Sequence, residues 1–275
     1  APIWPHGLEP QFQGSRFAIA RTRAAFRDWE EIREVEALFL DMIAAARRFI
    51  YAENQYFTSP KIAAAILRRM EEPDPPEIVL VGPIKAEGWL EQVAMDATRL
   101  RLIKIIGRTD PNNLFRLYTP KTVGGDDIYV HAKIMIVDDR ILRVGSSNLN
   151  NRSLGLDSEC DLALEASNEA EHAAIATLRT RLMAEHCGAS EEAIAASFAE
   201  TGSLIATIER FQGEGRRLEL LQYEKPKGVS KAIAETELLD PKSPDAMFEG
   251  MTRRTLFEPL KAVRRRRRQR KAQRA

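Results

Sequence analysis

The sequence predicts an α/β fold in which a mixed β-sheet is flanked by helices. The first observation is a set of short β-branched and apolar runs, such as EIVLVGP at 77–83, which are typical of buried strands. The second is the helical spacing of apolar residues in segments between these runs, for example in 28–48. The third is the alternation of the two patterns along the chain, which favours an α/β fold.

The predicted elements carry local signals of their own. The helix at 28–48 begins with acidic residues and ends with Arg47 and Arg48, as the helix dipole favours. A second helix, up to about Glu72, has Pro60 in its first turn, where proline is favoured. The other expected elements are strands at 49–54, 77–83 and 114–120, helices at 89–100 and 165–188, a hairpin at 128–148, mostly helical pattern to residue 222 and a short helix at 245–262.

Changes in pattern divide the chain into four parts. They are an irregular lead-in at 1–27, a central domain at 28–190, a helical extension at 191–262 and a basic tail at 263–275. The tail carries eight positive charges in RRRRRQRKAQRA, whereas the whole chain has a net charge of +1, so the remainder carries −7. We expect the tail to be disordered. It has the charge to bind an anionic membrane surface or a nucleic-acid backbone, and a tail without function is the alternative.

Several classes of protein are disfavoured by the apolar runs, the first residues and the cysteines of the sequence. No apolar run reaches the roughly 18 residues of a membrane-spanning helix, and the first residues lack the features of a signal peptide. Cys160 and Cys187 have neither metal-ligand spacing nor the arrangement of a disulfide framework. The sequence therefore predicts a soluble or peripheral membrane protein. It leaves export open, since the chain begins with Ala1 rather than methionine.

A polar cluster stands out in the predicted hairpin, whose segment 131–148 reads HAKIMIVDDRILRVGSSN. Residues two apart in a strand face the same side, so His131 and Lys133 share a face. A turn near residue 139 would bring Ser146 and Asn148 alongside them. Gly145 lacks a side chain and is expected to leave space beside the cluster.

The cluster has the chemistry of a phosphate site. Lysine, asparagine and hydroxyl groups together can bind a phosphate oxyanion, and a histidine can attack phosphorus or protonate a leaving oxygen. The sequence has no carboxylate cluster at metal-ligand spacing nearby. We therefore expect a metal-independent site without a cofactor, in which Lys133 supplies the positive charge. The alternative, a surface hairpin with a polar face, is disfavoured by the joint spacing.

The pattern His-x-Lys, four residues, Asp138, six residues, Gly-Ser-x-Asn resembles the HKD signature of the phospholipase D superfamily at every position. The flanking segments NRSLGLDSE at 151–159 and FIYAENQYFTS at 49–59 are similar to this superfamily as well. The resemblance runs from about residue 4 to about 190. It identifies the chain as similar to the C-terminal half of a two-motif bacterial phospholipase D, with residues 28–190 as the catalytic domain.

The resemblance implies a role for each matching residue. His131 would be the general acid and base of the second motif, while Lys133, Ser146 and Asn148 would bind phosphate oxygens. Asp138 belongs to the catalytic signature, but its place at the turn suggests that it holds the hairpin. Glu159 would orient the histidine. Further residues are expected to support the site without touching substrate: Glu53, Asn54, Gln55 and Gly145.

The mechanism that the resemblance implies needs two histidines, and this chain has one HKD motif. The other histidines, His6, His172 and His186, have no useful spacing and are interpreted as incidental. The second half-site would come from a missing N-terminal half of the protein or from a homodimer mate, as in single-motif nucleases of the superfamily. A non-catalytic remnant is the third alternative.

The leading hypothesis is a phosphodiesterase that hydrolyses or transfers the head group of phospholipids through a phosphohistidine intermediate. Its partners would be the phospholipid substrate, an anionic membrane surface bound by the tail at 264–275, and a second HKD half. A dimeric nuclease of the same superfamily is the first alternative, although the acidic body argues mildly against it. A lipid-binding or nucleic-acid-binding remnant without turnover is the second. The sequence does not specify the head group.

Overall fold

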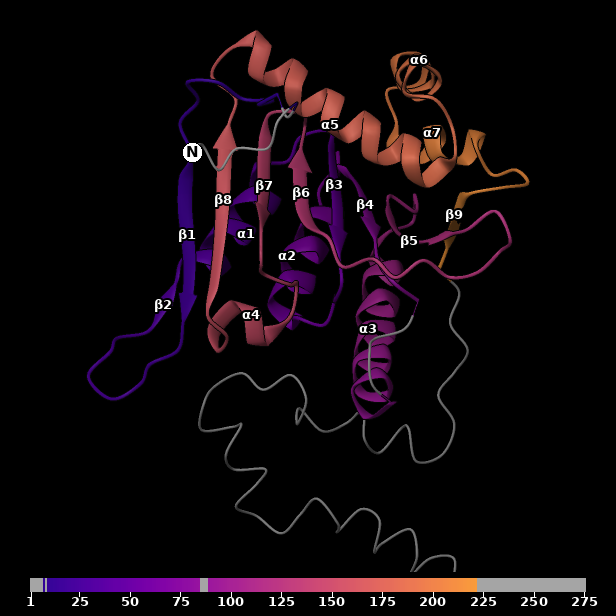
Figure 1. The fold of residues 1–275 in the computed structure, drawn as a ribbon. Coiled ribbons are helices and arrows are strands. Elements are labelled where there is room, and N and C mark those ends of the chain that lie inside the picture. Colours follow the sequence, from indigo (N-terminus) through magenta and orange to yellow (C-terminus); the bar gives the residue numbers. More distant parts are fainter. Residues whose placement is uncertain (1–6, 8, 85–88, 222–275) are drawn as a thin grey trace, which may run out of the picture.

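A nine-stranded mixed sheet lies at the centre of the computed structural model, which describes residues 7, 9–84 and 89–221 (Figure 1). Its strands are β1 (Ala18–Arg23), β2 (Ile32–Arg33), β3 (Phe49–Asn54), β4 (Glu77–Val81), β5 (Phe115–Lys121), β6 (Lys133–Val137), β7 (Ile141–Gly145), β8 (Glu159–Glu165) and β9 (Arg217–Leu220). The helices are α1 (Glu34–Ala45), α2 (Pro60–Met70), α3 (Trp89–Thr109), α4 (Asn151–Gly155), α5 (Glu169–Cys187), α6 (Glu191–Thr201) and α7 (Leu204–Arg210).

The strand order in the sheet is β2-β1-β8-β7-β6-β3-β4-β5-β9. β3, β4 and β5 run parallel, and α2 and α3 form the connections between them, as parallel strands require. The other neighbours are antiparallel, and the β6–β7 pair is the predicted hairpin. The predicted α/β fold with a mixed sheet is therefore confirmed.

Side-chain alternation along the central strands builds two separate cores. On β3, Ile50 and Ala52 belong to the core beneath α1, α2 and α3. Phe49 and Tyr51, on the opposite face of the strand, belong to the core that α5, α6 and α7 cover. All six residues of β3 are buried, so this strand lies in the middle of the molecule. Polar residues on this strand consequently need partners inside the fold.

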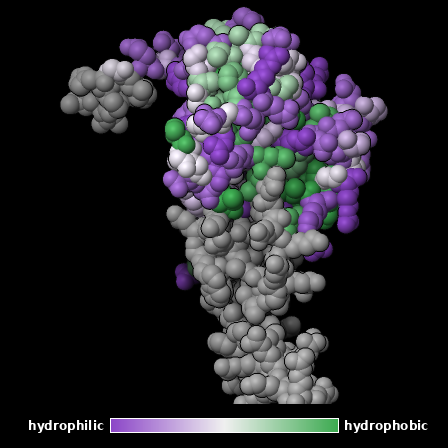
Figure 2. All heavy atoms as spheres, turned by 90° about the vertical axis from the view of Figure 1, so that its right-hand side faces the viewer, coloured by the Kyte–Doolittle hydropathy of each residue, from purple (hydrophilic) through white to green (hydrophobic). Residues whose placement is uncertain are grey.

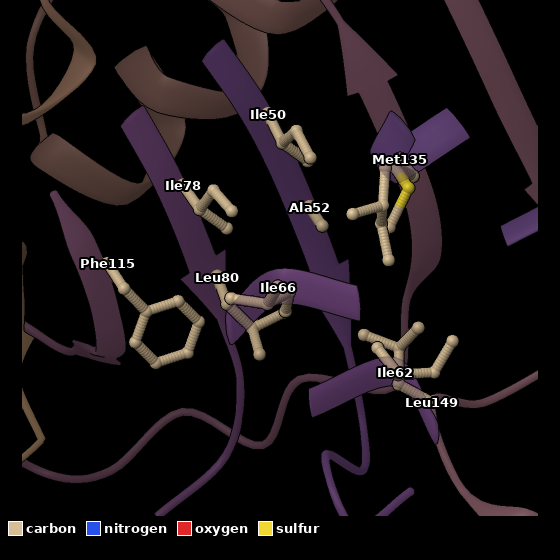
Figure 3. Close-up of a pocket in the computed structure, with 10 residues that line it drawn as sticks. Ile50, Ala52, Ile62, Ile66, Ile78, Leu80, Phe115, Met135 and Leu149 are labelled. Atoms are coloured by element: carbon tan, nitrogen blue, oxygen red, sulfur yellow. The ribbon is translucent and has the colours of Figure 1, made fainter. Parts of the chain in front are cut away.

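A void in the first core lies between α2 and the sheet (Figure 3). The ten residues that line it are all apolar: Ile43, Ile50, Ala52, Ile62, Ile66, Ile78, Leu80, Phe115, Met135 and Leu149. No polar group in this lining could orient a phosphodiester, and buried sites for such ligands need one. We therefore assign the void to the packing of the core.

Several expected boundaries differ from the structure. The expected lead-in at 1–27 contains β1, which pairs with β8 inside the sheet; residues 1–6 and 8 lie outside the described part. The helix expected at 28–48 begins only at Glu34, because β2 precedes it. β8, β9 and the short α4 were not expected. On β1 the buried side chains are small or polar while Ile19 is exposed, so the usual apolar pattern of a strand is missing.

The expected boundary at residue 190 does not separate two bodies. Ile194 of α6 and Leu204 of α7 are fully buried in the second core together with α5. β9 extends the sheet by pairing with β5, and Leu218 of this strand is buried. Residues 191–221 thus complete the domain. The helix predicted at 245–262 and the tail at 263–275 lie outside the described residues.

The described helices are not long and apolar enough to cross a membrane. Figure 2 shows one side of the molecule, where hydrophobic areas lie among a largely hydrophilic surface. A row of exposed apolar side chains runs across three neighbouring strands, in which Ile19 pairs with Leu162 and Leu162 pairs with Val144. This apolar row ends on the strand that leads directly into Ser146.

Candidate active site

The candidate site lies where β3 and β7 end and β6 and β8 begin, beside α4 at the lower end of the sheet in Figure 1. Asn54, the last residue of β3, pairs with Lys133, the first residue of β6. The hairpin pairs Ile134 with Val144, and this register leads from Lys133 toward Gly145. The expected gathering of both hairpin ends at one edge is therefore present.

His131 lies two residues before β6 and is exposed. Its imidazole stacks on the Tyr129 ring, with 6.5 Å between the ring centroids and an interplanar angle of 22°. Within the described part of the chain, no hydrogen bond ties down either ring nitrogen. The ring is thus held by stacking while both nitrogens can meet a ligand that enters from solvent.

Lys133 and Asn148 converge on a single acceptor. The Lys133 Nζ donates to Gln55 Oε1 at 3.2 Å, and the Asn148 Nδ2 donates to the same oxygen at 3.4 Å. The Lys133 Nζ also donates to the backbone oxygen of His131 at 2.8 Å. Two of the expected phosphate-binding groups are therefore aimed at one point, which is the arrangement that an oxyanion needs.

The surroundings of Lys133 shift the pKa of its amino group. Partial burial lowers the pKa of Lys133, and repulsion from the Arg143 guanidinium lowers it further, while the Glu159 carboxylate opposes the shift. Arg143 and Glu159 thus both act electrostatically on the amino group. A bound phosphate would act in the same direction as Glu159 and favour the charged lysine.

Gln55 is buried and oriented by two tyrosines. Its Nε2 donates to the Tyr129 hydroxyl at 2.6 Å and to the Tyr56 hydroxyl at 3.2 Å, which turns Oε1 toward Lys133. Tyr129 thereby connects the Gln55 amide to the face of the His131 ring. Tyr129 was not among the expected site residues, although its position two residues before His131 places both on one side of an extended segment.

The residues expected beside Gln55 divide between the two faces of the sheet. Asn54 Oδ1 accepts from the backbone N–H of Leu149 at 3.1 Å and its Nδ2 donates to the Ser147 oxygen at 3.4 Å, so it ties β3 to the site loop. Glu53 points to the opposite face. It accepts from the Tyr51 hydroxyl at 2.7 Å and contacts His186 Nε2 at 3.2 Å, so it takes no part in the cluster.

The side chains of Ser146 and Glu159 are hydrogen-bonded to each other. The exposed Ser146 hydroxyl donates to Glu159 Oε2 and accepts from the Cys160 N–H at 3.1 Å. In the described structure Glu159 is thus bonded to Ser146, whereas the expectation was a bond to His131. A carboxylate on Ser146 fixes the direction of that hydroxyl at the edge of the site.

Asp138 lies at the other end of β6, away from the cluster. Its carboxylate accepts the backbone N–H groups of Arg47, Arg48 and Phe49 at 2.7, 2.9 and 2.8 Å. Its φ of 55° is in the left-handed region, which aspartate tolerates in turns. These bonds agree with the expectation that Asp138 holds the hairpin, and its place in the catalytic group is corrected: this residue joins the hairpin turn to the start of β3.

Gly145 does not leave the open space that was expected. A Cβ at this position would lie 2.0 Å from Asp161 Oδ1 on the neighbouring strand β8. Asp161 and its partner Arg143 are fully buried, and neither was among the expected site residues. The space beside the glycine is filled by this carboxylate.

Metal ligands do not gather in the described part of the chain, where no three His, Cys, Asp or Glu side chains could hold an ion together. The candidate site instead gathers three hydrogen-bond donors at one edge of the sheet: the Lys133 ammonium, the Asn148 amide and the Ser146 hydroxyl. The arrangement can bind an anion, and the exposed His131 can exchange a proton with it or attack it.

Comparisons with known proteins find a matching family model and several curated relatives. The family described as cardiolipin synthase, PLD-like domain, matches residues 39–177. Phospholipase D zeta 2 of Arabidopsis thaliana is 30% identical over an alignment of 174 residues, and the match covers 48% of this chain and 17% of that protein. Phospholipase D C of Dictyostelium discoideum is 29% identical over an alignment of 146 residues, and the match covers 42% of this chain and 9% of that protein.

Two solved structures are similar at low sequence identity. Nuc from Salmonella typhimurium, a phospholipase D family member, has 16% identity and a TM-score of 0.43, with 61% of this chain and 93% of that chain covered. Phosphatidylserine synthase from Haemophilus influenzae has 16% identity and a TM-score of 0.44, with 60% and 38% covered. The chain spans a small fraction of the length of the curated relatives it matches.

Proposed function

Since the chain belongs to the phospholipase D superfamily, we propose that it supplies one HKD half-site of a phosphodiesterase that acts on the head group of phospholipids. The observation that supports this most is the convergence of Lys133 and Asn148 on one point at the edge where His131 is exposed. The names of the curated relatives, which are phospholipases D, favour a phospholipid as the substrate.

In the proposed reaction His131 serves as the acid and base. A histidine of a second half-site attacks phosphorus, and the bond from phosphorus to the leaving alcohol breaks while His131 protonates that alcohol oxygen. His131 then takes a proton from water or another alcohol, whose oxygen attacks phosphorus and breaks the bond to the histidine nitrogen. Lys133 and Asn148 stabilise the charge on the non-bridging oxygens in both steps.

The second histidine has to come from outside the described residues. A further segment of a longer protein is one source, because the chain matches only 9–17% of the length of its first relatives. A second copy of this chain across a two-fold axis is the other. The apolar row Ile19, Leu162 and Val144 lies on the strands that lead into the site and gives a partner half a surface to pack against.

The test replaces His131 by alanine in the complete enzyme and measures choline release from phosphatidylcholine vesicles and turnover of bis(p-nitrophenyl) phosphate. Loss of an acid and base predicts a decrease in kcat of about 100-fold to 10,000-fold. His172→Ala is the control, since the His172 ring contacts the backbone oxygen of Asp139 at the far end of the hairpin. Turnover by His131→Ala at the rate of the control would refute the proposal, and cleavage of DNA in place of both substrates would reassign it to a nuclease.

A further inference from the structure

A fully buried ion pair lies directly beneath the site loop. Arg143 of β7 and Asp161 of β8 are both 0% exposed. The Arg143 Nε donates to Asp161 Oδ2 at 2.8 Å, Nη2 donates to the same oxygen, and the guanidinium lies 4.6 Å from the centroid of the Phe39 ring. Burying two charges costs free energy that their attraction often fails to recover, so stability alone explains such a pair poorly.

The pair holds every polar group of Ser147. Asp161 Oδ1 accepts the Ser147 N–H at 3.2 Å and the Ser147 hydroxyl at 3.0 Å. The Arg143 Nη2 donates to the Ser147 backbone oxygen at 2.9 Å. Ser147 is itself fully buried, and it stands between Ser146 and Asn148, whose side chains belong to the candidate site. The ion pair therefore fixes the backbone from which both site residues project.

The glycine of the motif and Asp161 depend on each other. A Cβ at position 145 would lie 2.6 Å from Asp161 Cα as well as 2.0 Å from its Oδ1, so the carboxylate can reach Ser147 only past a glycine. Neither Arg143 nor Asp161 belongs to the HKD pattern. Asp161 nevertheless fills the space that the pattern's glycine provides, and Arg143 is its partner.

We infer that Arg143 and Asp161 are positioning residues, which hold Ser147 so that the side chains of Ser146 and Asn148 are directed at a bound phosphate group. This inference rests on the proposed function of the site. The pair is neutral as a whole, but the Arg143 guanidinium also acts electrostatically on Lys133. A test of the positioning role therefore has to compare variants in which both charges are absent and only the acceptor for Ser147 differs.

The test compares two double variants of the full chain that differ at one position. Arg143→Met/Asp161→Leu removes both charges and the acceptor for Ser147, whereas Arg143→Met/Asp161→Asn removes both charges and retains an oxygen acceptor. Inorganic phosphate is the probe, and its dissociation constant is measured by ³¹P NMR. Thermal unfolding of each variant is followed by circular dichroism. We expect about tenfold weaker binding for the leucine variant, the size of one lost hydrogen bond, and rescue toward wild-type affinity by the asparagine variant.

A matched control removes a buried ion pair elsewhere. Arg179, which is 3% exposed, pairs with Asp139 at the hairpin turn, and Arg179→Met/Asp139→Asn should lower Tm without changing phosphate affinity.

Wild-type affinity in a folded Arg143→Met/Asp161→Leu variant would overturn the positioning role while leaving the proposed function intact. If that variant does not fold, Ser147→Ala tests the inference instead, because it removes only the hydrogen bond from the Ser147 hydroxyl to Asp161. We expect this variant to bind phosphate about two- to fivefold more weakly. Unchanged affinity would overturn the inference. Absence of phosphate binding by the wild-type chain would overturn both proposals.

Discussion

Replacement of Asp138 by alanine should destabilise the fold without impairing the site. The substitution removes three hydrogen bonds from backbone N–H groups to a carboxylate. It also places alanine at a φ of 55°, a left-handed conformation that costs a residue with a Cβ about 1–2 kcal/mol. Hydrogen bonds to a charged group contribute about 1.5–3 kcal/mol each, and water replaces part of this at Arg47 and Arg48, which are exposed. A total of about 3–5 kcal/mol follows from these contributions.

Urea unfolding of wild type and Asp138→Ala measures this loss as a lower midpoint at an unchanged slope. Asp138→Asn should lose less, since asparagine also tolerates the left-handed region and keeps one acceptor. Asp127→Ala is the control, because its exposed ion pair with Lys121 contributes at most about 1 kcal/mol. The decisive quantity is phosphate affinity per folded molecule, which should stay at the wild-type value. A variant of wild-type stability that no longer binds phosphate would refute this reasoning and return Asp138 to the site.

Three further predictions concern the core and the thiols. Gly145→Ala should cost about 1–3 kcal/mol of unfolding free energy in the same urea assay, because its Cβ meets the carboxylate and the Cα of Asp161; an unchanged midpoint would contradict this close approach. Leu149→Ala should lower the unfolding free energy by about 2–5 kcal/mol, since this side chain is 2% exposed; a loss below 1 kcal/mol would contradict the packing described. Burial raises the pKa of the Cys187 thiol to about 12, so iodoacetamide at pH 8 should modify Cys160 alone in the folded protein and both thiols in urea, as mass spectrometry would show. The raised pKa makes a stabilising contribution that is complete below the unfolded value of 9.0 and is lost as the pH rises toward 12.

The parts of the site that could be predicted are those that lie close together in sequence. His131 lies just before β6 and Lys133 begins it, and the turn at Asp138 returns the chain to bring Ser146 and Asn148 to the same edge of the sheet. The alternation of strand residues, applied to FIYAEN, would have placed Glu53 on the face opposite Asn54, where the structure has it. Local periodicity was sufficient for these positions.

The positioning pair could not be predicted from local pattern. β8 buries Asp161 and exposes Leu162, which inverts the usual distribution, so its sequence does not read as a half-buried strand. The sequence likewise suggests that Arg143 is a solvent-facing residue of the hairpin. In the structure it is fully buried and pairs with Asp161, which lies 18 residues further along the chain. Buried charges that satisfy each other across strands become visible only when strand order and register are known.

The same limit applies to the ends of the sheet. β1 and β9 are joined to β8 and β5 by pairings that are remote in sequence, and each has few buried apolar residues of its own. Their stability comes from the neighbouring strand rather than from an internal pattern. The segment that forms β1 was therefore expected to be irregular, and the segment that forms β9 was expected to belong to a helical extension.

Titration of the full-length chain with inorganic phosphate, followed by ³¹P NMR, tests the phosphate-handling half-site most directly. We predict saturable binding to the wild type that weakens about tenfold or more in Lys133→Ala, because a charge-assisted contact is lost. Arg181→Ala, which removes an exposed cation on α5, should bind as the wild type does. Equal binding by the Lys133 and Arg181 variants, or no binding by the wild type, would contradict the account.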